Sequence, residues 1–177
     1  MLVLVFDPFH GAAGDMITGA LLDCGADRDC VMRGMQSVIT KPSVTEVSRA
    51  GIRALKVDTH ATPTRRTLSE VIGQLDRVQG NIPAEALEMA KRVFLRISDA
   101  EVKIHGAHAH FHEVGADDAI ADVIGACTAL HSLRVDRVAV MPVALGGGSG
   151  IGSHGVFPIP APATAEILRQ SNLMIRQ

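Results

Sequence analysis

Aromatic residues are nearly absent from this sequence, which has no Trp, no Tyr and only five Phe among 177 residues. A hydrophobic core must therefore consist of aliphatic side chains and Met, and the hydrophobic share of 47% is enough for one domain with a sizeable core. The chain also lacks a run of Lys or Arg and a basic stretch rich in aromatics, and its net charge is -2. These absences argue against a nucleic-acid partner.

Cysteine is scarce, and long apolar runs are missing. The three cysteines, Cys24, Cys30 and Cys127, are odd in number and widely spaced, which argues against a disulfide scaffold and favours a cytoplasmic protein. The opening segment 1–6 is too short for a signal peptide or a membrane span. We therefore expect no membrane association, and we interpret residues 2–6 as a strand covered on both faces.

One stretch, residues 104–122, concentrates side chains that bind metals, because four of the eight histidines fall within eight of its residues. In an extended backbone the side chains of His108, His110 and His112 point the same way. Imidazole is a common ligand near neutral pH and suits nickel, zinc, copper and iron. The pattern predicts a metal or anion site, and a polar loop that is merely rich in histidine is the alternative. The other titratable residues here are His105, Glu113, Asp117, Asp118 and Asp122.

A glycine-bearing loop between strand 2–6 and a following helix predicts a second part of the site. Asp7 ends the strand and Asp15 begins the helix, with Gly11 and Gly14 between them. Backbone N–H groups at a helix N-terminus favour anions, and residues just beyond strand ends line the crevice of α/β sheets. For Asp15, capping of the helix is an equally good interpretation.

The helix expected from 117 or 118 to about 133 has an unusual polar face. Asp118 and Asp122 are four residues apart, and their neighbours on this face are Ala126 and Ala129 rather than long charged side chains. Such small neighbours predict close packing, with Asp122 partly enclosed and in need of a cation or hydrogen-bond donors. The alternative is a helix cap at Asp118 and a carboxylate on the surface at 122.

Six glycines fall between positions 146 and 155, after a second apolar strand at 137–142. Ordering so many glycines costs conformational entropy, so the segment is either a loop that faces a ligand or a disordered loop. Gly147 and Gly148 are candidates to approach a phosphate with their backbone, and His154 ends the segment.

The fold class predicted from these patterns is α/β, a single domain over 1–177 with a small mixed β-sheet flanked by helices. Expected strands lie near 2–6, 44–48, 52–59 and 137–142. The second and third form a hairpin, because apolar and polar residues alternate on both sides of Gly51. Helices are expected at 68–78, from Pro83 to a stop at Gly106, and from about Ala163.

Three motifs, in order along the chain, resemble the LarC-type nickel-insertion proteins; they read DPFHGAAGDM, HFHEVGADDAIADVIGA and HGVFPIPAPATAEIL. The resemblance implies a nickel chelatase of the lyase class, which delivers Ni²⁺ into a pyridinium-3,5-bisthiocarboxylic acid mononucleotide and consumes CTP with Mg²⁺ or Mn²⁺. Together with the chemistry of the side chains, it predicts catalytic roles for Asp7, Asp15, Glu113 and Asp122. Phosphate contacts are predicted for Gly11, Gly14, Gly147 and Gly148, and metal binding for His108, His110, His112 and His154.

The chain also departs from that family in ways that bear on function. Pro8 and His10 stand where the first motif usually has Cys and Ser, so a thiol ligand is missing. Family members are longer, with a C-terminal region associated with nucleotide binding. We therefore expect one part of a larger or split protein, with a C-terminal partner chain and a homo-oligomeric state. The alternatives are a metal-dependent phosphoesterase or other hydrolase, and a non-catalytic nickel metallochaperone module.

Overall fold

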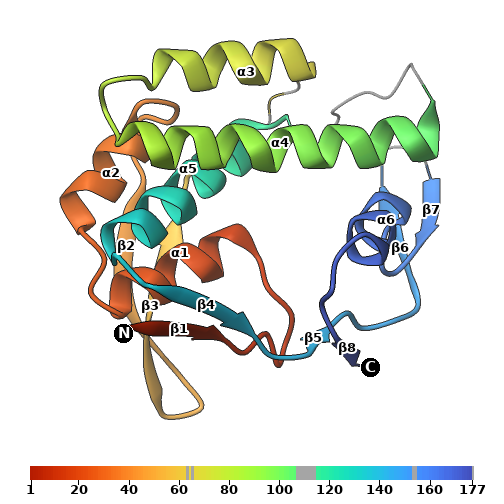
Figure 1. The fold of residues 1–177 in the computed structure, drawn as a ribbon, viewed down its shortest axis with the longest axis horizontal. Helices are drawn as coiled ribbons and strands as arrows, with labels where there is room; N and C mark the ends of the chain where they lie inside the picture. Colours follow the sequence, from red (N-terminus) through yellow and green to blue (C-terminus); the bar gives the residue numbers. More distant parts are fainter. Residues whose placement is uncertain (63, 65, 107–114, 153–154, 177) are drawn as a thin grey trace. The chain divides into compact units, whose positions relative to one another are not determined.

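The computed structural model describes residues 1–62, 64, 66–106, 115–152 and 155–176 (Figure 1). The chain divides into two compact units, a smaller one with residues 1–12, 95–110 and 135–177, and a larger one with residues 13–94 and 111–134. Both contain helices and short strands, so the predicted α/β class is confirmed.

The larger unit combines helices with one antiparallel hairpin. Its strands β2 and β3 pair through their whole length, as the alternating pattern predicts, and the turn between them uses positive φ at Ala50 and Gly51. The elements are α1 (Gly14–Asp23), α2 (Arg28–Gln36), β2 (Ser43–Arg49), β3 (Ile52–Asp58), α3 (Leu68–Arg77), the first half of α4 (Ala84–His105) and α5 (Asp117–Ser132).

An aliphatic core fills the larger unit, as the lack of aromatics requires. Its largest fully buried side chains come from five helices, α1 to α5, and include Leu21, Met35, Leu75, Phe94, Ile120 and Ile124. Helix α3 begins with a capping box, in which Thr67 and Glu70 each bind the other's backbone N–H. Its buried residues Val71 and Leu75 lie one turn apart, which explains the regular apolar spacing in the sequence.

Glycines let α1 and α5 approach their neighbours closely. A Cβ atom at Gly19 of α1 would lie 2.4 Å from the backbone oxygen of Leu55 in β3. A Cβ at Gly125 of α5 would lie 3.1 Å from both Met35 and Thr18. The small residues therefore set the distances between α1, α5 and the hairpin, because interiors are close-packed and larger side chains would force the elements apart.

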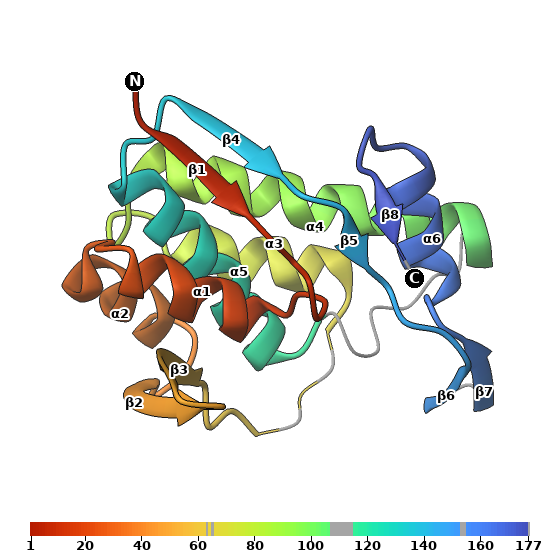
Figure 2. The same cartoon turned by 90° about the horizontal axis from the view of Figure 1, so that it is seen from below.

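The smaller unit contains three pairs of short strands in its described residues, together with the second half of α4 and helix α6 (Pro162–Arg169). Strands β1 (Val3–Phe6) and β4 (Arg137–Val140) are parallel neighbours (Figure 2). The others are β5 (Val143–Ala144) with β8 (Ile175–Arg176), which are parallel, and β6 (Ser149–Gly152) with β7 (Gly155–Pro158), which are antiparallel.

Three expectations about strands need correction. The four predicted strands form, but among the described residues they belong to separate pairs and not to one sheet. The strand at 2–6 is not covered on both faces, because Val3 and Val5 are 41% and 54% exposed. The glycine-rich segment is not a loop throughout: β6 and β7 make a hairpin in it, with Gly150 against the ring of Phe157.

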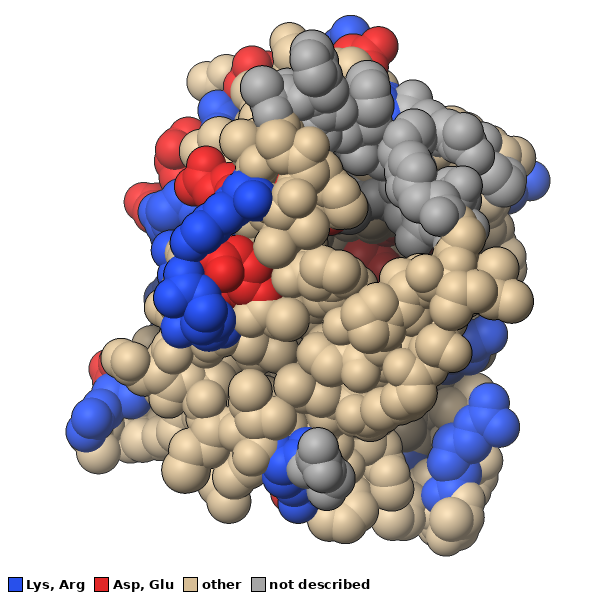
Figure 3. Space-filling view, turned by 90° about the vertical axis from the view of Figure 1, so that its right-hand side faces the viewer, with Lys and Arg blue, Asp and Glu red and all other residues tan. Residues whose placement is uncertain are grey.

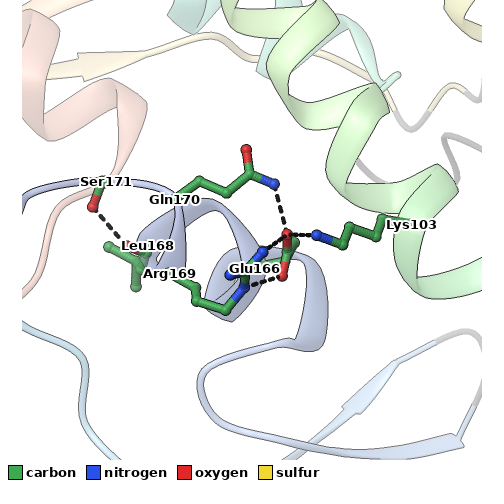
Figure 4. A network of polar contacts seen from close by, with 6 residues as sticks. All are labelled: Lys103, Glu166, Leu168, Arg169, Gln170 and Ser171. Carbon is green, nitrogen blue, oxygen red and sulfur yellow. Dashed lines mark hydrogen bonds and ion pairs between the residues drawn. The ribbon is translucent and has the colours of Figure 1, made fainter.

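A buried carboxylate fastens α6 to the last turns of α4 within the smaller unit (Figure 4). Glu166 is 7% exposed, and its oxygens accept hydrogen bonds from Lys103 at 2.7 Å, from Arg169 at 2.8 and 2.9 Å, and from Gln170 at 2.6 Å. The hydrogen bonds from Arg169, Lys103 and Gln170 hold the pKa of Glu166 far below its usual range.

The close approach at Gly19 predicts that its replacement by Ala weakens the fold. The added methyl meets the Leu55 backbone, so we expect Gly19→Ala to lower the free energy of unfolding by roughly 1–3 kcal/mol. Gly73→Ala is the matched control, because Gly73 also lies in a helix but has open space around its Cβ position. For Gly73→Ala we expect the free energy of unfolding to rise by about 0.5–1 kcal/mol. Urea unfolding of both variants tests this, and equal effects would contradict it.

The Glu166 network predicts an acid-sensitive contribution to stability. A depressed carboxyl pKa stabilises the folded state above the unfolded-state pKa and loses this effect as the pH falls below it. We expect Glu166→Gln to lower the melting temperature at pH 7, with a difference from the wild type that shrinks below about pH 4. Thermal unfolding followed by circular dichroism from pH 7 to pH 3 measures this. A constant difference over that range would show that the charge of Glu166 is not responsible.

Candidate functional site

The predicted site residues are divided between the two units, and several lie outside the described residues. Asp7, Gly11, Gly147 and Gly148 belong to the smaller unit. Gly14, Asp15 and Asp122 belong to the larger unit. The residues for which the structure gives no description are His108, His110, His112, Glu113 and His154. The predicted roles of those five stay predictions.

An acidic cluster forms in the larger unit where the first turns of α1 and α5 meet. Asp15 lies in the first turn of α1, and Asp118 lies in the first turn of α5, one turn before Asp122. The two helices touch here: a Cβ atom at Gly14 would lie 2.6 Å from the Cβ of Asp122. Gly14 is therefore needed for the packing of α1 against α5, a role that its place in a glycine-bearing loop does not reveal.

Asp122 is the carboxylate whose pKa this arrangement raises. Burial, followed by repulsion from Asp15 and from Asp118, raises the pKa of Asp122 to about 7, and a hydrogen bond from the Asp15 backbone partly opposes the shift. Its Oδ1 atom is buried and has no hydrogen-bond partner among the described residues. The prediction that Asp122 is partly enclosed is confirmed. A partly buried carboxylate with one oxygen left without a donor is suited to receive a cation or to hold a proton near neutral pH.

The other acids at these helix starts are not N-caps. The N-cap positions are Ala13 and Ala116, so Asp15 and Asp118 each occupy the second helical residue, and the capping interpretation of both is wrong. Asp15 Oδ1 accepts the N–H of Met16 at 2.8 Å. Carboxylates in a first turn interact favourably with the positive end of the helix dipole, which helps the cluster to carry several negative charges.

Asp117 fixes the start of α5 through the segment before α3. Its side chain forms an ion pair with Arg66, and its backbone N–H donates to Thr64 Oγ1 at 2.8 Å. Both side chains of the ion pair are mostly buried, at 18% and 17% exposure. The sequence shows arginines at 65 and 66 but gives no sign that Arg66 orients the helix with the acidic cluster.

The acidic cluster alone is not a complete metal site. Among the residues that the structure describes, no group of three His, Cys, Asp or Glu side chains is arranged to hold a metal ion. Carboxylates suit hard cations, whereas nickel also accepts imidazole nitrogen. A metal bound at Asp122 would therefore need further ligands from water, a substrate or other residues, and the histidines at 108–112 precede α5 directly in the sequence.

Asp7, in the smaller unit, has a partner that the sequence did not suggest. Arg176 of β8 places a guanidinium nitrogen 4.0 Å from Asp7 Oδ1, and its Cζ lies 3.9 Å from the centre of the Phe9 ring. The backbone at Gly11 adopts φ +85°, and a Cβ there would lie 3.6 Å from the Ala144 oxygen. The strand pair β5–β8 thus holds the loop after β1. The last residues show no periodicity, so no signal in the sequence could have identified Arg176.

The remaining candidates for ligand contact are less defined. Gly147 and Gly148 have open space at their Cβ positions, and Gly148 adopts φ +95°. A pocket of about 300 Å³ lies along α3, and its lining residues, none of which is a predicted site residue, are Arg66, Ser69, Glu70, Gly73, Gln74 and Arg77. Its arginines are already engaged, Arg66 by Asp117 and Arg77 by Gln74 at 3.1 Å.

Basic surface groups and long apolar helices are the features through which proteins contact nucleic acids and membranes. On the face shown in Figure 3, outside its grey atoms, Lys and Arg side chains form small separate groups, some beside Asp or Glu. None of the helices in the described part of the chain is both long and apolar enough to cross a bilayer.

Comparisons with known proteins assign the family. The profile of the family described as "Nickel insertion protein" matches residues 4–177. The chain belongs to the nickel insertion protein family. Relatives called "Putative nickel insertion protein" include that of Methanococcoides burtonii, 44% identical over 181 residues, and that of Methanosarcina mazei, 42% identical over 184 residues. The resemblance inferred from the three motifs is confirmed.

The relatives are longer than this chain. The Methanococcoides burtonii match covers 99% of the chain but 45% of the relative. A relative from Geotalea uraniireducens is 37% identical, and its match covers 96% of the chain and 45% of that relative. The chain therefore spans about half the length of the curated relatives it matches. No solved structure matches it.

The raised pKa of Asp122 predicts how pH affects stability. Between about pH 4 and pH 7 the folded protein holds a proton that the unfolded chain has released, so stability falls as the pH rises through this range. Asp122→Asn removes this effect. After allowance for solvent screening, we expect it to raise the free energy of unfolding at pH 8 by about 1–2 kcal/mol, with little difference near pH 4.

Urea unfolding at pH 4, 6 and 8 tests the role of Asp122, with Asp99→Asn as the control. Asp99 is an exposed acid on α4, and its replacement should change stability equally at each pH. If Asp122→Asn behaves like Asp99→Asn, the carboxylate at 122 is not destabilised by its surroundings.

Proposed function

We propose that this chain is the nickel-handling part of a protein that inserts nickel into a pyridinium-3,5-bisthiocarboxylic acid mononucleotide, in maturation of a nickel-pincer cofactor. Membership of the nickel insertion family over residues 4–177 carries the proposal. The acidic cluster around Asp122 adds a physical reason, because it keeps a poorly solvated carboxylate oxygen without a partner among the described residues.

Nickel is the cargo in this reaction, so its ligands must both bind and release it. The imidazoles of His108, His110, His112 and His154 supply nitrogen ligands of intermediate softness, and the carboxylates supply negative charge. Asp122 is suited to the release step, since a group with a pKa of about 7 takes up a proton readily when the cation leaves. The acidic cluster is an incomplete ligand set among the described residues, and the substrate sulfurs can complete the coordination of nickel during transfer.

Formation of the nickel–carbon bond in the pincer displaces a proton from the pyridinium ring, and a base must accept it. Asp122, Asp15, Glu113 and Asp7 are the carboxylates proposed for catalysis. Asp122 fits this role best, because a base with a pKa near the working pH combines availability with proton affinity. The nucleotide phosphate is proposed to contact the backbone at Gly11, Gly14, Gly147 and Gly148.

Other parts of the proposal concern the rest of the protein. We assign the proposed consumption of CTP with Mg²⁺ or Mn²⁺ to a C-terminal portion outside this chain, so this chain would act as an insertase together with that portion. A homo-oligomeric state and a cytoplasmic location complete the proposal. The alternative proposal is a metallochaperone module that binds nickel without catalysis.

The proposal predicts that the purified chain binds Ni²⁺ stoichiometrically. We expect the double variant His110→Ala/His112→Ala to weaken binding by more than about tenfold. The matched control is His60→Ala/His131→Ala, which removes two histidines already close to polar partners, Ser43 at 2.9 Å and Glu85 at 3.7 Å. Equilibrium dialysis with metal analysis measures uptake. Equal loss in both double variants, or none in the first, would refute the assignment of the metal ligands.

The variant Asp122→Asn tests the contribution of the acidic cluster to nickel binding separately from that of the histidines. We expect it to reduce nickel affinity and to remove the rise in affinity between pH 6 and 8 that competition with the Asp122 proton produces. A panel of phosphate esters with Ni²⁺, Mn²⁺ or Zn²⁺ tests the hydrolase alternative. Turnover of any ester without a pincer nucleotide would favour hydrolysis over insertion.

A further inference from the structure

Strand β4 is an apolar edge strand with its outer side open. All of its residues, Arg137–Val140, are exposed, and the next residue, Met141, is 48% exposed. Among the described strands, β4 pairs only with β1. Proteins usually protect such an edge with Lys, Pro, a bulge or a covering element, since unpaired backbone groups beside apolar side chains bind other strands. Here Arg137 is the one charged residue of the strand.

The parallel pair β1–β4 is also apolar on both faces. The register places Val3 beside Arg137 and Val5 beside Ala139 on one face. On the opposite face Val138 and Val140 are 47% and 37% exposed. Parallel sheets are normally covered on both sides, and two strands alone do not make a stable sheet. The two strands therefore have the apolar composition of strands in the middle of a sheet, but their side chains are as exposed as those of strands at a sheet edge.

Backbone hydrogen bonds show which groups face the open side. The N–H of Arg137 donates to Leu2 at 3.3 Å, and the N–H of Met141 donates to Phe6 at 2.8 Å. Because a strand alternates the direction of its backbone groups, those of residues 137, 139 and 141 face β1. The N–H and C=O groups of Val138 and Val140 then face the open edge.

The smaller unit has little core of its own. Among the described residues, its buried apolar side chains are Pro8, Ala100 and Ala163, whereas all the others belong to the larger unit. These three small side chains bury too little apolar surface to offset the entropy of ordering this many residues. An additional layer of apolar polypeptide on β1–β4 would supply what the unit lacks.

We propose that a strand from the portion of the family protein outside this chain pairs with the open edge of β4 and extends the β1–β4 sheet. The length of the relatives identifies this occupant, because more than half of each lies outside the match. That portion belongs to the same protein in the relatives, so it is present beside β4 at high effective concentration. The pairing is β-strand addition, in which main-chain bonds give affinity and the valines give a complementary apolar surface. It does not depend on the nickel chemistry proposed above.

The test joins this chain in frame to the portion of the Methanococcoides burtonii relative that its match leaves out. Amide hydrogen exchange is compared at single residues between the joined protein and the chain alone. We expect the Val138 and Val140 amides to exchange at least about tenfold more slowly in the joined protein. The Met141 amide, which already donates to Phe6, and the amides of the hairpin β2–β3 should change much less.

Val140→Pro provides the matched variant. It removes an N–H that faces the open edge and leaves the Met141 bond to β1 in place, so the chain alone should keep its melting temperature. In the joined protein the variant should abolish the added protection at Val138. Ala139→Pro is the control, because it removes a group that faces β1 and should destabilise both proteins. Unchanged exchange at Val138 and Val140 after joining overturns the proposal. Protection that instead rises with the concentration of the chain alone also overturns it, since a second copy is then the occupant.

Discussion

The close contact between α1 and α5 is the constraint on which the candidate site depends. Gly14 has no side chain, so the first turn of α1 comes against the Cβ of Asp122, with which any larger residue would collide. The contact removes water from Asp122 and brings Asp15 near it, whereas Asp118 lies one turn before Asp122 on α5 itself. Burial and the repulsion from both acids raise the pKa of the Asp122 carboxyl. The aliphatic packing of the larger unit therefore creates the electrostatic property that makes Asp122 a candidate to handle a cation or a proton.

This arrangement works against stability at neutral pH. Three carboxylates at the meeting of two helix starts repel one another, and the helix dipoles compensate only in part. The core around them must hold the helices together, and Thr18 contributes a bond from its hydroxyl to the Asp122 backbone at 3.4 Å. Destabilised charges of this kind are characteristic of functional sites, where a cation or substrate relieves the strain.

The smaller unit presents the opposite situation, with good strand sequences and little burial. The Glu166 network holds α6 against α4, and Arg176 holds the loop after β1. Polar contacts therefore hold together elements that in most domains are held by a hydrophobic core. Its apolar strands β1 and β4 remain exposed. An exposed apolar surface of this kind marks a site where another polypeptide can bind.

The sequence by itself determined the features that depend on near neighbours in the chain. The hairpin β2–β3, the stop of α4 at Gly106 and the spacing of Asp118 and Asp122 on one helix follow from alternation, backbone freedom and helical period. The family, too, was evident from motifs in the sequence. Tertiary structure alone decided that β1 pairs with β4 and β5 with β8, that β1 is exposed and that Arg176 meets Asp7, since these depend on packing between segments far apart in the chain. The raised pKa of Asp122 depends on both the sequence and the tertiary structure. The sequence shows that Asp122 lies on a helix face with small neighbours, but its burial results from the packing of α1.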